Sequence, residues 1–260
     1  MSTIPVRPRG RPRTTDDPST VVAVERAIRL LRLLAAHDGL TVSEAAELGG
    51  QPLASTFRAL TTLEAEGMVE SEDMRFRIGA GAFRLGNAFL RRDSLVARAA
   101  APMARLRDEL SETVSLAIAS GGEVLHLAEA EGPRQLRANF PPGSRAPLHA
   151  SASGKALLAW GAVEPGALVR HTSLTITAAA ALDRELSGIR ERGHALDDQE
   201  SMEGMRSVAA PIFGHDGRAH AALALSAPAF RLSLSDAQRA GTALRAAADL
   251  LTAATAGSGP

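Results

Sequence analysis

The 260-residue sequence predicts an α+β protein built from two domains. Two observations lead to this fold class. The first ninety or so residues show helical periodicity in successive segments and end in one short alternating run, whereas the later residues alternate strand-like runs with helical ones. Antiparallel strands with helices before, within and after them indicate an α+β sandwich in the second half. The chain is also long enough for two domains.

The composition narrows the class of protein. The formal net charge is zero, so any nucleic-acid binding has to come from locally placed charges. No cysteine is present, which excludes disulfides, thiolate zinc sites and cysteine catalysis, and fits a cytoplasmic protein. The seven histidines show no metal-ligand spacing, so we expect no metal and no cofactor. Because no apolar run approaches the roughly 20 residues of a membrane span, we expect no membrane partner.

The first twenty residues form a basic arm. They are rich in Pro, Thr and Arg, lack apolar periodicity, and are expected to be disordered in the free protein. Their centre, Arg7-Pro8-Arg9-Gly10-Arg11-Pro12-Arg13, resembles the core of an AT-hook, in which prolines keep the backbone extended and arginines favour the narrow minor groove of A·T tracts. The alternative is a solubilising tail. The candidate DNA contacts here are Arg9, Gly10, Arg11 and Arg13.

The segment from Thr41 to Gly67 predicts two short helices joined by a tight turn. Thr41 and Glu44 have the spacing of a capping box, and Gly49-Gly50 ends the first helix. Apolar residues three positions apart are expected to be buried in the second helix: Phe57, Leu60 and Leu63. Polar residues between them are expected to point outward: Ser55, Thr56 and Arg58. This pattern is typical of a DNA-binding helix-turn-helix, although an ordinary αα-hairpin fits the spacing equally well.

Segments on either side complete the predicted first domain. Before it, an amphipathic helix is indicated by apolar residues at helical spacing: Val24, Ala27, Ile28, Leu31 and Leu34. After it, residues 68–78 predict a hairpin whose alternation places Met74, Phe76 and Ile78 on the core face and Arg75 and Arg77 on the other. A hairpin with paired arginines after such a helix is a wing, which grips flanking DNA backbone or minor groove. The alternative is a solvated strand face.

The second half predicts a series of strands between helices. A helix begins at Asp93 or Ser94 and runs to Leu110. Strand-like runs follow at residues 113–119, 124–128, 136–140, 208–213 and 219–226. Between them, residues 147–159 pass from an extended into a helical pattern, and residues 182–192 predict a helix closed by Gly193. A long Ala-rich helix starts at Ser235.

In this order the elements resemble an IclR-type bacterial transcriptional regulator. The likeness rests on motifs in both halves: Val24-Glu25-Arg26-Ala27, Thr41-Val42-Ser43-Glu44, Pro52 to Arg58, Gly67-Met68-Val69, Ile78-Gly79, Leu85-Gly86, Glu112-Thr113-Val114, Pro147-Leu148-His149-Ala150, Gly154-Lys155-Ala156, Arg192-Gly193, Asp197 to Glu200, and Val208 to Pro211. The resemblance covers residues 21–250. After the basic arm at 1–20, it implies a winged helix-turn-helix DNA-binding domain at 21–80, a linker helix at 81–92 and a GAF-like effector-binding domain at 93–256.

The sequence contains no convincing catalytic motif. Gly154-Lys155 does not complete a phosphate loop, because that motif requires a glycine where His149 stands and Ser or Thr where Ala156 stands. Ser151 and Ser153 have no base fixed beside them, so no catalytic residue is expected and the protein is not expected to be an enzyme.

The candidate effector-binding residues lie at a strand-to-helix junction and on late strands. The helix that opens near Ala150 offers free amides that favour a carboxylate. The resemblance implies an effector pocket that includes Ala152, Ser153, Asp197, Ser207 and Ser226. The full candidate set is His149, Ala150, Ser151, Ala152, Ser153, Asp197, Glu200, Ser207 and Ser226. His149 is more often a hydrogen-bonded core residue, and the alternative for the others is a structural role at the sheet edge.

The resemblance therefore implies a regulator that forms a homodimer or dimer of dimers, binds a pseudo-palindromic double-stranded operator and responds to a small carboxylate or aromatic catabolite. The candidate DNA-binding residues outside the arm are Thr41, Ser43, Gln51, Ser55, Thr56, Arg58, Arg75 and Arg77. We expect Arg9, Arg11, Arg75 and Arg77 to supply much of the affinity. The competing classes are an enzyme and a signalling module whose first domain binds only proteins. Repression and activation are equally compatible with the sequence.

Overall fold

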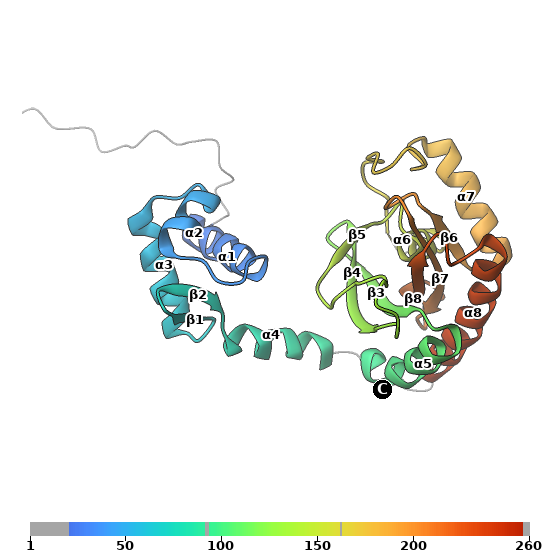
Figure 1. Ribbon diagram of the computed structural model, residues 1–260, viewed down its shortest axis with the longest axis horizontal. Helices are drawn as coiled ribbons and strands as arrows, with labels where there is room; N and C mark the ends of the chain where they lie inside the picture. Colours follow the sequence, from blue (N-terminus) through green and yellow to red (C-terminus); the bar gives the residue numbers. More distant parts are fainter. Residues whose placement is uncertain (1–20, 92–93, 162, 257–260) are drawn as a thin grey trace, which may run out of the picture. The chain divides into compact units, whose positions relative to one another are not determined.

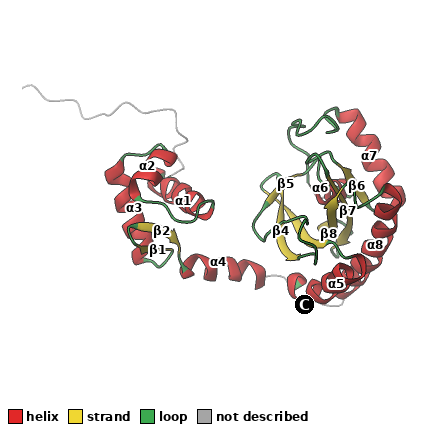
Figure 2. Ribbon diagram, in the orientation of Figure 1, coloured by secondary structure: helices red, strands yellow, loops and turns green. Residues whose placement is uncertain are grey.

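The computed structural model describes residues 21–91, 94–161 and 163–256, so the arm with Arg9, Gly10, Arg11 and Arg13 lies outside the described residues. The chain divides into two compact units, residues 1–91 and 92–260, each of which is described by itself (Figure 1). Each unit contains helices and antiparallel strands (Figure 2), which confirms the α+β class.

The first unit is a helical domain with one hairpin. Its elements are α1 (Val22–Ala35), α2 (Val42–Gly49), α3 (Leu53–Ala65), β1 (Val69–Glu72), β2 (Arg75–Ile78) and α4 (Ala80–Arg91). β1 and β2 pair antiparallel, and Leu40 adds an isolated bridge to Phe76. One small core joins α1, α2, α3 and the hairpin: Leu30, Leu34, Leu40, Ala45, Leu60, Val69 and Phe76. Three helices and a hairpin on one core form the winged helix-turn-helix expected from the sequence.

Local signals build the turn between α2 and α3. The capping box is confirmed, since the Glu44 amide donates to Thr41 Oγ1 (3.3 Å) and the Thr41 amide donates to the Glu44 carboxylate (2.8 Å). Gly50 follows α2 with φ +60°, a left-handed conformation that strains residues with a side chain. Pro52 then stands at the N-cap of α3, where its missing N–H leaves no helical hydrogen bond unmade.

The buried stripe of α3 contains the predicted Leu60, with Leu63 packed partly buried against the core, but it has Thr56 in place of Phe57. Thr56 and Leu60 are fully buried, whereas Phe57 is 54% exposed. Residues four apart share a helix face, so Thr56 and Leu60 point to the core together. The expectations that Phe57 is buried and that Thr56 points outward are therefore wrong.

The first helix faces the core with only part of the predicted stripe, in which Leu34 is buried and Leu31 packs partly buried against the core. Leu30 and Leu34 are its buried residues, while Val24 and Ile28 are exposed. The predicted set combined positions on two neighbouring stripes of a helix that is apolar over more than one face, so helical spacing alone could not select the buried stripe.

The hairpin tip explains why the predicted strand was too long. Asp73 and Met74 both have positive φ, 49° and 62°, so they are turn residues, and Met74 is 80% exposed. Phe76 is buried, whereas Ile78 is 36% exposed. The placement of Met74 and Ile78 in the core is wrong. Only Phe76 joins the core from this strand.

The second unit is a curled antiparallel sheet covered by helices on both faces (Figure 1). Its elements are α5 (Leu95–Leu110), β3 (Thr113–Ser120), β4 (Glu123–Ala130), β5 (Arg145–Pro147), α6 (Ala152–Ala159), α7 (Ala179–Arg192), β6 (Ala195–Asp198), β7 (Met205–Phe213), β8 (Ala219–Pro228) and α8 (Leu234–Ala256). The strand order is β5-β4-β3-β8-β7-β6. α5 and α8 pack on one face of this sheet, and α6 packs on the other.

Most of the expected strands are present, but the strand predicted at residues 136–140 is wrong. That segment has no strand pairing and forms part of a loop. Its single deeply buried residue, Ala138, is held through its carbonyl by the Thr113 hydroxyl (2.8 Å). The short strands β5 and β6 were not predicted, because three or four residues are too few to show a period of two.

The two faces of the sheet differ in side-chain size. The face under α5 and α8 carries large residues such as Leu116, Leu223 and Leu225. The face under α6 carries mainly alanines: Ala117, Ala195, Ala209, Ala222 and Ala224. The candidate effector residues of the strands lie on this second face.

Candidate DNA interface and effector site

The outer surface of α3 is partly apolar. Leu53 and Phe57 are 55% and 54% exposed, and Arg58 is exposed as predicted. Ser55 is half-buried and Thr56 is buried, with its hydroxyl donating to the Pro52 carbonyl (3.2 Å). The face available to a DNA groove therefore combines apolar side chains with one guanidinium, and Thr56 does not belong to it.

Both wing arginines are engaged in ion pairs within the unit. Arg75 Nη1 lies 3.3 Å from a Glu44 carboxylate oxygen and donates to the Gly39 carbonyl at 3.0 Å. Arg77 pairs with Glu72 at 3.0 Å and with Asp38 at 3.4 Å. A phosphate has to compete with these carboxylates for the guanidinium groups.

Thr41 and Ser43 differ in availability. The Thr41 hydroxyl and amide are both used in the capping box, and the Thr41 amide is the main reason that the pKa of Glu44 lies below its usual value. Ser43 is exposed in the first turn of α2. Of these two candidate DNA contacts, Ser43 has the accessible hydroxyl.

A groove of about 330 Å³ lies between α1 and α3. Its lining is Ala23, Arg26, Ala27, Gln51, Ser55, Arg58, Ala59, Thr62 and Leu63. Gln51 is 9% exposed, and neither atom of its side-chain amide has a hydrogen-bond partner. Within the described part of the chain, no ion pair joins Arg26 or Arg58 to a carboxylate. The groove brings together Gln51, Ser55 and Arg58 from the predicted set. It adds Arg26, which was named from the sequence only within the Val24-Glu25-Arg26-Ala27 motif and not as a DNA contact.

The second unit carries a row of polar residues across four neighbouring strands. Thr113 pairs with Ser226, Ser226 with Ser207, and Ser207 with Asp197. Residues paired in register lie on the same face of a sheet, so all four share the face under α6. The structure thus brings Asp197, Ser207 and Ser226 together, although they are distant in the sequence.

Three buried serines at this location have hydroxyls without a hydrogen-bond partner, and these hydroxyl oxygens are not fully enclosed. Ser153, Ser207 and Ser226 are 4%, 7% and 3% exposed, and no hydrogen bond of their hydroxyls is found among the described residues. Ser153 reaches the site from the first turn of α6, which packs on β7 and β8. Burying a hydroxyl without a hydrogen bond costs free energy, so such a cluster indicates a ligand or ordered water.

The remaining residues of the junction support α6. Ser151 is its N-cap, and its hydroxyl accepts from the Gly154 amide (3.2 Å) and donates to the Pro147 carbonyl (2.6 Å). A side chain at Gly154 would come within 2.2 Å of the Leu148 carbonyl, which explains the glycine. His149 Nε2 contacts the Val169 carbonyl at 2.8 Å, so His149 is a hydrogen-bonded core residue. Ala150 and Ala152 are fully buried.

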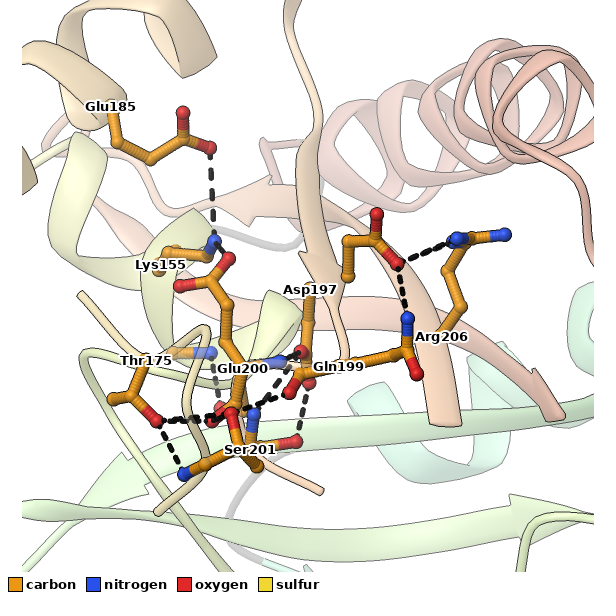
Figure 3. A network of polar contacts seen from close by, with 12 residues as sticks. Lys155, Thr175, Glu185, Asp197, Gln199, Glu200, Ser201 and Arg206 are labelled. Carbon is orange, nitrogen blue, oxygen red and sulfur yellow. Dashed lines mark hydrogen bonds and ion pairs between the residues drawn. The ribbon is translucent and has the colours of Figure 1, made fainter. Parts of the chain in front are cut away.

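Asp197 and Glu200 form a polar network with their neighbours (Figure 3). Asp197 Oδ1 accepts from the amides of Glu200 (2.7 Å) and Ser201 (3.2 Å), and its other oxygen accepts from the Ser201 hydroxyl. Burial raises the pKa of the Asp197 carboxyl. Asp197 therefore fixes the turn that follows β6, at the end of the serine row.

Glu200 is ion-paired with Lys155, which is fully buried, and Lys155 also lies 3.7 Å from Glu185 (Figure 3). The second carboxylate oxygen of Glu200 is buried without a partner. Burial raises the pKa of Glu200 to about 7. Glu200 also lines a cavity of about 560 Å³ beside β6, together with residues such as Ile176, Leu196 and Leu234. None of the serines of the row lines that cavity.

These features define a class of protein: a winged helix-turn-helix unit joined to a second unit with a polar cluster inside a small-residue sheet face. The chain belongs to the IclR family of bacterial transcriptional regulators. The IclR helix-turn-helix domain matches residues 23–73, and the bacterial transcriptional regulator IclR C-terminal domain matches residues 87–253. The resemblance inferred from the sequence is confirmed.

Relatives with assigned roles support the same conclusion. The chain is 41% identical over 245 residues to the HTH-type transcriptional regulator BhcR of Paracoccus denitrificans, covering 88% of each chain. It is 34% identical over 242 residues to the HTH-type transcriptional repressor AllR of Salmonella typhi, again covering 88% of each. These relatives are transcriptional regulators, a class of proteins that are not enzymes.

Solved structures show the same fold. An IclR transcriptional regulator from Alicyclobacillus acidocaldarius superposes with a TM-score of 0.79 at 27% identity, covering 91% of this chain and 99% of that one. An IclR homologue from Microbacterium hydrocarbonoxydans, complexed with 4-hydroxybenzoate, superposes with a TM-score of 0.78 at 23% identity, covering 91% and 100%. This protein is thus a DNA-binding regulator of the IclR type with a C-terminal effector domain.

Within residues 21–91, 94–161 and 163–256, no helix is long and apolar enough to cross a bilayer. No group of three or more His, Asp or Glu side chains in these ranges is arranged to hold a metal ion.

Proposed function

We propose that this regulator acts in the cytoplasm, where it binds a pseudo-palindromic operator as a homodimer or dimer of dimers and senses a small organic carboxylate or aromatic catabolite. Two reading heads related by a two-fold axis match two half-sites about one duplex turn apart. A ligand that binds one conformer better than the other shifts the equilibrium between them, and the change in operator affinity is limited by its difference in affinity for the two conformers.

The single observation that carries the ligand proposal is the group of unpartnered hydroxyls of Ser153, Ser207 and Ser226. Ser207 and Ser226 are directly paired on neighbouring strands, a spacing that lets both donate to one carboxylate. The N-terminal turn of α6 adds free amides and a favourable dipole on the same face. The family relationship supports this location.

For the DNA interface, we propose that the outer face of α3 selects the sequence and that Arg26 and Arg58 hold the backbone. Their guanidinium groups have no competing carboxylate among the described residues, and the unpartnered amide of Gln51 supplies a further donor in the groove between them. Ser43 and Ser55 are the other proposed contacts. Arg75 and Arg77 contribute less, since both are already ion-paired. Within the arm, Arg9, Gly10, Arg11 and Arg13 stay proposed minor-groove contacts.

The test is a fluorescence-anisotropy titration of full-length protein on the DNA upstream of its own gene, at several salt concentrations, with and without candidate carboxylates. Sequence-selective binding that weakens with salt is expected, together with an affinity change when a carboxylate is bound. Salt-insensitive binding, or equal affinity for unrelated DNA, contradicts the DNA proposal. A Ser207→Ala/Ser226→Ala variant that keeps the ligand response contradicts the ligand site.

A further inference from the structure

We propose that the cavity beside β6 is a second ligand site, which binds a linear aliphatic diamine in its doubly protonated form. The cavity has a volume of about 560 Å³ and lies at the free edge of the sheet, because β6 is the last strand in the sheet order. Residues of α7, β6, the turn after β6 and α8 line it, together with the loop before α7. The site is independent of the proposed carboxylate site, since no serine of the row lines this cavity.

The two more exposed carboxylates of the cavity, Glu185 and Asp198, each use only one oxygen. Glu185 Oε1 accepts from Arg192 at 2.6 Å, and Asp198 Oδ1 accepts from Arg206 at 2.6 Å. The second oxygen of each has no hydrogen-bond or ion-pair partner among the described residues, and neither oxygen is fully enclosed. Both carboxylates therefore present a free acceptor to a ligand.

The third carboxylate of the cavity, Glu200, lies deeper and is incompletely neutralised. Its Oε1 pairs with Lys155, whose ammonium group lies between Glu185 and Glu200 (Figure 3). Its Oε2 is buried without a partner. Burial raises the pKa of Glu200 to about 7, so Lys155 alone does not fully compensate this buried carboxylate. A further ammonium group in the cavity would stabilise its ionised form.

His194 supplies an acceptor that is not an acid. It is 8% exposed and lines the same cavity, and its ring fills the space left by Gly241 of α8, where a Cβ would lie 2.5 Å from His194 Cδ2. Burial and the nearby Arg192 lower the pKa of the ring, so the imidazole is neutral at pH 7 and above. A neutral imidazole has one donor and one acceptor nitrogen. The interaction with the Arg192 backbone uses the donor, which leaves the acceptor nitrogen for a ligand.

The lining selects the chemistry of the ligand. Apart from the exposed amide of Gln238, its free polar groups are acceptors, and an ammonium group has three donors and no acceptor. Among the described residues no group of three His, Asp or Glu side chains is arranged to hold one metal ion, so the acceptors suit a longer cation. A methylene chain between two ammonium groups fits the apolar part of the lining, which consists of Leu174, Ile176, Leu196, Leu234 and Ala237.

Isothermal titration calorimetry of the full-length protein at pH 8 with 1,4-diaminobutane and 1,6-diaminohexane tests the site. The matched diols have the same chains without charge, and MgCl₂ has the same charge without a chain. At least one diamine is expected to bind about tenfold more tightly than its diol and than Mg²⁺. If neither diamine binds, or if each binds no better than its diol or Mg²⁺, the proposal is overturned.

Substitutions in the lining locate the bound diamine. Glu185→Gln and Asp198→Asn each remove one charged acceptor and are expected to weaken diamine binding about tenfold. Gln238→Trp fills an exposed position of the lining without changing any charge, so it should also weaken binding and decides the matter if the other two variants fold poorly. Unchanged affinity in every folded variant of these three contradicts the site.

Two controls separate this site from general charge effects and from the serine row. Asp183→Asn removes an exposed acid of α7 that does not line the cavity, and it should change the affinity less than twofold. An equal loss in Asp183→Asn and Glu185→Gln would overturn the proposal. The Ser207→Ala/Ser226→Ala variant should bind the diamine as the wild-type protein does. A loss of diamine binding in that variant would place the diamine at the serine row and overturn the second site.

Discussion

The two units of this regulator place their unpartnered polar groups in opposite locations. In the first unit such groups line a surface groove and include two guanidinium groups, Arg26 and Arg58. In the second unit the unpartnered groups at the sheet face under α6 are neutral, namely the hydroxyls of Ser115, Ser153, Ser207 and Ser226 and the imidazole of His126. Elsewhere in that unit, one carboxylate oxygen of Glu200 and the Ser144 hydroxyl are also unpartnered.

The difference follows from the cost of burying charge. A phosphate backbone can be met at the surface, where water solvates a cation until DNA arrives. A small effector enclosed in a domain has to be met by groups whose burial is tolerable when the site is empty, and neutral hydroxyls meet that condition better than free charges do. The buried ion pair of Lys155 and Glu200 is the exception in the second unit.

Lys155→Met tests that exception and should give the largest effect. Removing the ammonium leaves the Glu200 carboxylate buried without its cation, which is expected to lower the free energy of unfolding of the second unit by about 3–5 kcal/mol at pH 8. The cost should shrink as pH falls, because burial already raises the pKa of Glu200 and the loss of Lys155, which lowers it, raises it further. Urea unfolding followed by circular dichroism at pH 6 and pH 8 measures both quantities.

The double variant Lys155→Met/Glu200→Gln is the control, since it removes both charges. It should be more stable than Lys155→Met at pH 8. If the single and double variants are equally stable at both pH values, the unpaired charge of Glu200 does not cause the loss of stability. The loss would then come from altered packing alone.

His126→Phe tests how the burial of a neutral, unpartnered group in the second unit affects stability. The pKa of His126 is lowered to about 4 in the folded state, against an ordinary value of 6.5, so the unfolded chain takes up the proton first as pH falls. The stability associated with the neutral ring is full above pH 6.5 and is lost as pH falls toward 4. Over that range the wild-type protein should lose about 3 kcal/mol more than His126→Phe. Parallel stability curves for the two proteins contradict this.

Sequence reasoning reached the architecture of this protein because its signals are local. The Thr41–Glu44 capping box, Gly193 after α7 and the long strands β7 and β8 each follow from neighbouring residues. The buried face of α3 could not be predicted from neighbouring residues. Hydrophobicity predicts that Phe57 is buried and Thr56 exposed, and the structure shows the reverse. Only packing against α1 and the hairpin decides which of two adjacent stripes is buried.

The site shows the same division. Ser207 and Ser226 were named through the family resemblance, and strand register then places them side by side. Ser115 and His126 could not be found in this way. In the sequence each is an ordinary residue of a strand pattern. Only the folded chain shows that its polar atoms have no hydrogen-bond partner. Arg26 was likewise not predicted as a DNA contact. It becomes a candidate only when the structure shows which other arginines are already ion-paired.

Substitutions of arginine test the first unit. Arg26→Gln and Arg58→Gln are each expected to weaken operator binding about tenfold and to reduce the slope of log affinity against log salt by about 1. Arg75→Gln and Arg77→Gln are matched controls and should weaken binding less than threefold, because phosphate would first have to displace their carboxylate partners. Anisotropy titrations over a range of salt concentrations measure both. The opposite ranking would restore the wing as the main backbone contact.

Thr41→Ala should give the smallest effect, a loss of about 1 kcal/mol in the free energy of unfolding of the first unit. The variant tests whether Thr41, at the start of α2, has a structural role or a DNA-binding role. The cap is shared with the wing, because Glu44 accepts from the Thr41 amide and hydroxyl and also pairs with Arg75. Thr41→Ser keeps the capping oxygen, so it should restore stability. If Thr41 acts only as a cap, operator affinity measured well below the melting temperature should be equal for Thr41→Ala and Thr41→Ser. A loss of affinity in Thr41→Ala without a loss of stability would instead make Thr41 a direct DNA contact, and the capping box would be free to open when DNA binds.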